Sequence, residues 1–159
     1  MKSIDTGAPD GQATSHLPGA EGERGDVLPA GRITVTHAGG DSYRIAVRGH
    51  HLVVDQPLAD GGGDVGPTPT ELFAASLASC VAYYAGRYLV RHRVDPQDLR
   101  VDAQFDMAAD RPARVGALRL SIVVPEGLEP AKYEALLAVA SHCTIHNTGL
   151  EEHPCQIVR

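Results

Sequence analysis

The stretch "TPTELFAASLASC", residues 68–80, constrains the fold more than any other part of this sequence. Thr68 is a good N-cap, Pro69 suits the first helical position, and Glu71 stands three residues after the cap, which completes a capping box. Apolar positions then recur every three or four residues, at Phe73, Leu77, Cys80, Tyr84 and Tyr88. The pattern predicts a long helix that ends near residues 91–93, where arginines suit the negative end of its dipole.

This helix should lie at the centre of the fold, because its remaining positions are mostly small or apolar as well. Alternating apolar and polar residues predict strands on both sides of it. A three-stranded antiparallel meander precedes it, at residues 32–38, 42–49 and 50–57. A strand hairpin, a second helix and a last short strand follow it, at residues 99–108, 115–125, 129–143 and 155–159. This order predicts an α+β fold with antiparallel sheets and two main helices.

Composition divides the chain into a tail and one domain. Residues 1–29 hold Gly, Pro, Ala, Ser and acids with no aromatic residue, which predicts a flexible tail or an arm that wraps a partner subunit. Residues 30–159 are long enough for one domain with its own core. The glycine-rich stretch "GGGDVGP" lacks a nucleotide-binding fingerprint, so we interpret it as a flexible connection into the long helix and predict no cofactor.

The charge and the cysteine count exclude several classes of partner. A formal net charge of −6 disfavours nucleic acid and anionic membranes, both of which attract basic proteins. No apolar run approaches the roughly 18 residues of a membrane span, and the N-terminus does not read as a signal peptide. Three cysteines without a secretory signal favour a reducing compartment, and we therefore expect a cytoplasmic protein.

Two cysteines are candidates for chemistry. Cys80 is either a small core residue or a reactive thiol, and as a thiolate it needs a cation from elsewhere in the protein. Cys143 follows the second helix and is flanked by His142 and His146. It is either a helix-end residue or a redox partner of Cys80, which requires α-carbons within roughly 7 Å.

Metal binding is a separate alternative. Zinc-type ligands gather near the C-terminus, but without the usual paired spacing: His142, Cys143, His146, His153 and Cys155.

The acid and the cation that a reactive Cys80 needs are harder to assign. Glu71 is most simply the capping-box acid, and it lies on the opposite face of the helix from Cys80, about 13 Å along the axis. Any shared role therefore requires a bridging side chain or a second subunit. Candidate cations occur in the early strands, at Arg32, Arg44 and Arg48, where arginine is usually a solvated surface residue.

The segments "DQPLADGGGDVGPTPTELFAASLASC" and "VPEGLEPAKYEALLAVASHCTIHNTGL" resemble the OsmC/Ohr family of osmotically induced and organic hydroperoxide resistance proteins. The resemblance covers roughly residues 30–159 and is closer to the general OsmC-like branch. It implies an intertwined homodimer in which the long central helices are buried. It also implies a stress-response thiol peroxidase that reduces organic hydroperoxides, with hydrogen peroxide as a second candidate substrate.

In this family the reactive cysteine corresponds to Cys80 and the resolving cysteine to Cys143. The resemblance implies that they close a disulfide, which a dithiol of the lipoyl type then reduces. The family's hydroperoxide branch has its acid where this chain has Thr70 and its arginine where this chain has Asp41, so the nearest equivalents are Glu71 and Arg44. Cys155 has no counterpart and is interpreted as a core thiol. The alternative function is a non-peroxidatic protein that binds a small hydrophobic ligand in the dimer cleft.

Overall fold

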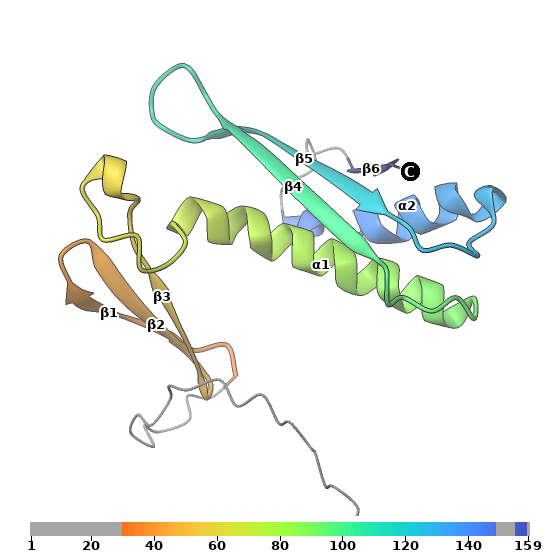
Figure 1. Cartoon of the computed structure of the whole chain (residues 1–159), viewed down its shortest axis with the longest axis horizontal. Helices are drawn as coiled ribbons and strands as arrows, with labels where there is room; N and C mark the ends of the chain where they lie inside the picture. The colour runs from red at the N-terminus through yellow and green to blue at the C-terminus, as the bar shows by residue number, and fades with distance from the viewer. Residues whose placement is uncertain (1–29, 149–154, 159) are drawn as a thin grey trace, which may run out of the picture.

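The computed structural model describes residues 30–148 and 155–158, which form two three-stranded sheets and two main helices. Figure 1 shows β1–β3 at one end of the long helix α1, while β4–β6 and α2 lie along its length. The predicted α+β class is confirmed. Expectations for residues 1–29, His153 and the Cys155 side chain fall outside the described residues.

The first sheet is the predicted meander. Strands β1 (Ile33–Gly39), β2 (Ser42–Val47) and β3 (His50–Val54) pair antiparallel in that order. Their register aligns Val35 with Ile45 and Ile45 with Leu52, so one face of the sheet is apolar across all three strands. On the other face, Thr36 pairs with Arg44.

The second sheet contains β4 (Arg100–Met107), β5 (Val115–Val123) and β6 (Cys155–Val158). The predicted hairpin is confirmed, since β4 and β5 pair antiparallel. The last strand, β6, instead runs parallel to β5. Parallel neighbours need a crossover connection, and α2 lies within the connection between these two strands.

Helix α1 (Pro69–Arg91) begins and ends where the sequence predicts. The Thr68 hydroxyl accepts a hydrogen bond from the Glu71 backbone N–H at 3.1 Å, and the Glu71 carboxylate accepts one from the Thr68 backbone N–H at 2.7 Å. The capping box is therefore complete. Arg91 stands in the last turn, at the negative end of the helix dipole.

The buried face of α1 differs in part from the expected one. Leu77 and Tyr88 are buried as predicted, but Phe73 is 38% exposed, and Cys80 and Tyr84 are only half-buried. Val81 and Ala85 occupy the centre of the buried face instead, both without exposed surface. Small and β-branched residues allow α1 to lie close to the second sheet and α2.

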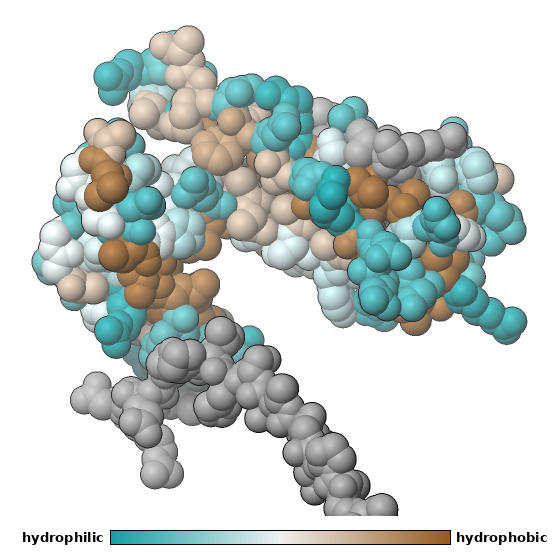
Figure 2. Space-filling model, viewed as in Figure 1, coloured by the Kyte–Doolittle hydropathy of each residue, from teal (hydrophilic) through white to brown (hydrophobic). Residues whose placement is uncertain are grey.

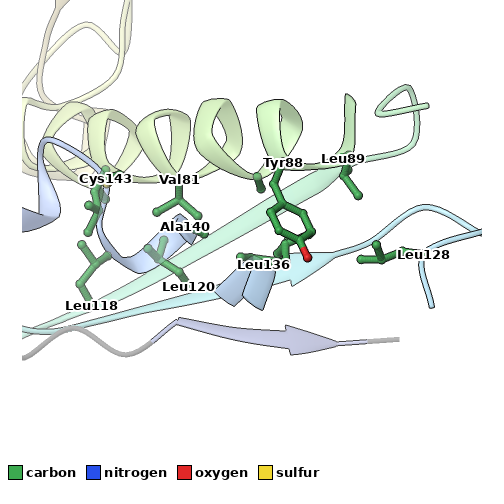
Figure 3. Packing of buried hydrophobic residues seen from close by; sticks show 13 residues of the cluster. Val81, Tyr88, Leu89, Leu118, Leu120, Leu128, Leu136, Ala140 and Cys143 are labelled. Carbon is green, nitrogen blue, oxygen red and sulfur yellow. The ribbon is translucent and has the colours of Figure 1, made fainter. Parts of the chain in front are cut away.

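The main core forms between α1, β5 and α2 (Tyr133–Ser141), which a short 3-10 turn, η2 (Pro130–Lys132), precedes. Figure 3 shows Val81 and Tyr88 of α1 facing Leu120 of β5 and the helix α2. Leu136 and Ala140 of α2 are fully buried in this layer, while Tyr133 and Leu137 pack at its edge. Two further 3-10 turns are η1 (Leu58–Asp60) and η3 (His146–Thr148).

The glycine-rich connection into α1 is tied to the sheet, so its interpretation as a flexible link is wrong. The buried carboxylate of Asp55 accepts hydrogen bonds from the backbone N–H groups of Gly63 at 2.9 Å and Val65 at 3.2 Å. Gly66 passes so close to β3 that a Cβ atom would lie 2.3 Å from the Val53 carbonyl oxygen. The connection therefore fixes the end of β3 to the start of α1.

Candidate functional site

The two candidate cysteines lie together in the core between α1 and α2. Cys80 comes from the middle of α1, is half-buried, and packs against the cluster of buried residues that includes Cys143. Cys143 lies two residues after the end of α2 and has no exposed surface. In Figure 3 its side chain lies beside α1, near Leu118 of β5.

The two sulfur groups are close enough to interact. Burial raises the pKa of the Cys143 thiol, backbone N–H groups of His146 and Ile145 lower it in part, and the adjacent Cys80 side chain raises it further. Both cysteines are reduced in this structure. Burial therefore favours the protonated form of the Cys143 thiol, which lies next to the half-buried Cys80.

The segment that carries Cys143 is held in a compact turn. The Asn147 backbone N–H donates to the Cys143 carbonyl at 3.0 Å, and the Thr148 hydroxyl donates to the Thr144 carbonyl at 2.8 Å. The Tyr84 hydroxyl of α1 lies 3.0 Å from the Thr144 hydroxyl. The buried Nδ1 atom of His146 has no hydrogen-bond partner in the structure.

Glu71 and Arg44 stand apart from the two thiols in the architecture of this chain. Glu71 is exposed and its carboxylate also accepts a hydrogen bond from the Thr68 hydroxyl at 3.0 Å, within the capping box. Arg44 is exposed on the polar face of β2. Arg32 precedes β1 and Arg48 follows β2, so both lie at the same end of the first sheet. None of these arginines forms an ion pair with another described residue.

The zinc alternative gains no support from the described part of the chain. Across residues 30–148 and 155–158, no group of three or more His, Cys, Asp or Glu side chains is arranged to hold a metal ion. Within the same ranges, no helix is long and apolar enough to cross a bilayer.

Sequence reasoning missed two residues beside the thiols, Tyr84 and Thr144, and one under the glycine-rich connection, Asp55. Asp55 directly follows an apolar run. Its position before a glycine-rich stretch was the one local sign that its carboxylate could hold a loop. Tyr84 was expected to be a core residue of the helix, but it is half-buried and its hydroxyl has a partner, as tyrosine hydroxyls inside proteins usually do. Thr144 follows Cys143 directly, but no local pattern links it to a residue of α1, because its partner Tyr84 lies 60 residues earlier in the chain.

These features define a class: an α+β domain in which a central helix and the end of a second helix bring two free thiols together. The family model for OsmC-like proteins matches residues 61–157, well over half of the chain, and the chain belongs to this family. No curated protein matches the sequence.

Solved structures agree with the fold. A candidate osmotic stress induced and detoxification response protein from Psychrobacter arcticus 273-4 has a TM-score of 0.71 at 21% identity, over 82% of this chain and 96% of its own. The organic hydroperoxide resistance protein OsmC from Legionella pneumophila has a TM-score of 0.60 at 19% identity, over 79% of this chain and 94% of its own. OhrB, an organic hydroperoxide resistance protein of Bacillus subtilis, has a TM-score of 0.57 at 19% identity, over 79% of this chain and 96% of its own.

Proposed function

We propose that this protein is a thiol peroxidase that reduces organic hydroperoxides through Cys80 and Cys143. The proposal depends on one observation: the half-buried Cys80 and the buried Cys143, from distant parts of the sequence, lie next to each other as free thiols. Two of the structural relatives are named as organic hydroperoxide resistance proteins. Reduced thiols also suit a cytoplasmic location, which is part of the proposal.

The chemistry follows from the exposure of the two thiols. Cys80, the more accessible sulfur, attacks the terminal oxygen of the hydroperoxide, the O–O bond breaks, and the alcohol leaves as Cys80 becomes a sulfenic acid. The Cys143 sulfur then attacks the Cys80 sulfur and releases water, which leaves a disulfide. A small dithiol, for which we propose a lipoyl-type compound, reduces the disulfide to two thiols and regenerates the enzyme.

We further propose that a homodimer completes the site. A thiolate at Cys80 needs a nearby cation. The candidate arginines Arg32, Arg44 and Arg48 lie in the first sheet or directly beside its strands, and this sheet is at one end of α1. Part of the apolar face of this sheet is exposed: Ile33 is 62% exposed and Val35 is 56% exposed. Figure 2 shows hydrophobic surface over this region. A second copy would cover this face. In the resulting dimer, one of these arginines, steered by Glu71, would reach the thiol of the other copy.

The direct test measures consumption of cumene hydroperoxide in the presence of dihydrolipoic acid. The wild type should turn over repeatedly, Cys80→Ser should be inactive, and Cys143→Ser should react once and then accumulate oxidised Cys80. Methionine substitutions at Arg32, Arg44 and Arg48 should identify the activating cation, since only one of them should slow the reaction of Cys80. Equal peroxide consumption by the wild type and Cys80→Ser would eliminate the proposed activity.

A second candidate function, binding of a small hydrophobic ligand, is favoured by a groove of about 570 Å³ along the C-terminal half of α1. Its lining includes Tyr83, Val90, Pro96 and Leu99, and Val90 is 61% exposed. A protein that only binds such a ligand would keep its affinity in the Cys80→Ser variant. A peroxidase whose dimer interface fills this groove would show no ligand binding there.

A further inference from the structure

The Tyr84–Thr144 hydrogen bond joins the two elements that carry the thiols. Tyr84 lies one helical turn after Cys80, about 6 Å further along the α1 axis. Thr144 is the residue directly after Cys143. Their hydroxyl oxygens are 3.0 Å apart. The contact therefore joins α1 to the Cys143 segment beside the Cys80–Cys143 pair itself.

We propose that Tyr84 and Thr144 form a latch that positions Cys143 for attack on oxidised Cys80. This inference rests on the proposed peroxidase function. Both residues are positioning residues, because they act through the place of the Cys143 sulfur and not on the substrate. Cys143 stands outside a regular helix, since α2 ends at Ser141, so its approach to Cys80 depends on the turn that carries it.

The latch matters because oxidised Cys80 has two competing fates. In the productive reaction, Cys143 attacks the sulfenic sulfur, the S–O bond breaks, and the hydroxyl leaves with the thiol proton as water. In the competing reaction, a second hydroperoxide molecule transfers an oxygen atom to the sulfenate, giving a sulfinate and an alcohol. The burial that raises the pKa of Cys143 disfavours its thiolate. Close positioning of Cys143 is therefore required to favour the disulfide.

The test uses substitutions that delete one hydroxyl each and keep the shape of the side chain. Tyr84→Phe and Thr144→Val should raise the ratio of Cys80 sulfinate to Cys80–Cys143 disulfide by about three- to tenfold at a fixed excess of cumene hydroperoxide. The double variant should be no worse than either single variant, because both remove the same hydrogen bond. Peptide mass spectrometry measures both products.

Tyr88→Phe is the matched control. Tyr88 lies on the next turn of α1, and its hydroxyl donates to the Lys132 carbonyl at 3.4 Å, away from Cys143. Its removal should leave the sulfinate-to-disulfide ratio at the wild-type value. A general loss of stability would change this ratio in all three tyrosine and threonine variants alike. An unchanged ratio in Tyr84→Phe and Thr144→Val would overturn the latch.

A second experiment separates the latch from the peroxidase proposal. Diamide oxidises a thiol pair directly, taking up two electrons and two protons, so it needs no sulfenic acid. If the latch is correct, diamide should close the Cys80–Cys143 disulfide about three- to tenfold more slowly in Tyr84→Phe than in Tyr88→Phe. Equal rates in these two variants refute the latch. A wild type that closes the disulfide with diamide but not with hydroperoxide refutes the peroxidase and leaves the latch standing.

Discussion

The two sheets of this protein bury their apolar residues to very different extents. In the second sheet, Leu118, Leu120 and Ile122 of β5 have no exposed surface, because α1 and α2 cover them. In the first sheet, Val35 is 56% exposed and Leu52 is 43% exposed, although their register builds an equally continuous apolar face. The second sheet thus completes its core within one chain. The first sheet has a continuous apolar face that the described residues leave partly exposed, which is the physical argument for a second copy.

The largest effect in this comparison should come from the covered sheet. Leu120→Ala removes a fully buried side chain from the α1–β5–α2 core, so it should lower the free energy of unfolding by about 2–5 kcal/mol. Urea denaturation followed by circular dichroism measures the loss. Gln104→Ala, at an exposed position on the neighbouring strand β4, is the control and should change stability by less than about 0.5 kcal/mol. Similar losses in the two variants would show that this layer is not the principal core.

The uncovered sheet should respond through association. Val35→Lys places a charge in the middle of the apolar face, so it should convert the proposed dimer to a monomer at micromolar concentration, as measured by sedimentation velocity. Thr36→Lys is the matched control, since the next residue of the strand points to the opposite face and should leave the dimer intact. A wild type that sediments as a monomer, or a Val35→Lys variant that remains a dimer, would contradict the proposed role of this face.

The connection between the sheet and α1 should show a pH-dependent contribution to stability. Burial works to raise the pKa of Asp55, but hydrogen bonds from the backbone of Gln56, Val65 and Gly63 outweigh it and lower the pKa below the ordinary value of 3.8. The charged form is therefore favoured by folding. Its stabilising contribution is present above pH 3.8 and is lost as the pH falls through the lowered pKa.

Asp55→Asn should accordingly be less stable than the wild type at pH 7. The difference in the free energy of unfolding should become smaller below pH 3.8. Urea titrations at several pH values measure this. Asp60→Asn, at an exposed residue of the same connection, should behave like the wild type. The difference in the free energy of unfolding between Asp55→Asn and the wild type could instead stay constant down to pH 2. That result would mean that the carboxylate charge does not hold the connection.

The smallest effect concerns the reactivity of Cys143. Because burial raises its pKa, alkylation of Cys143 by iodoacetamide in the folded protein should have its pH midpoint above 9.0. The same thiol in urea-denatured protein is the reference and should titrate near its ordinary value. Peptide mass spectrometry follows each cysteine separately. Identical pH midpoints in the folded and denatured protein would show that Cys143 is not buried in solution.

Much of the fold follows from local patterns in the sequence. The capping box at Thr68 and Glu71 set the start of α1, and period-two alternation located the β1–β3 meander and the β4–β5 hairpin. What local patterns did not show depends on contacts between distant residues. The parallel pairing of β6 with β5, the Asp55 carboxylate under the glycine-rich connection, and the Tyr84–Thr144 hydrogen bond each join parts of the chain that have no shared sequence periodicity.

The candidate site likewise has one part that the sequence could predict and one part that it could not. The contexts of Cys80 and Cys143 mark them as candidates, and the structure places them together. The activating cation is different, because Arg32, Arg44 and Arg48 lie on the sheet that one chain leaves uncovered. In the proposed dimer the arginine and the thiol belong to different copies, so their geometry is present neither in the sequence nor in a single protomer.

The most direct test of the central claim is peptide mass spectrometry of the reduced protein after one equivalent of cumene hydroperoxide. The account predicts a Cys80–Cys143 disulfide within one chain, formed together with one equivalent of alcohol. Oxidation spread over all three cysteines, or a sulfinate at Cys80 with Cys143 still a free thiol, would contradict it.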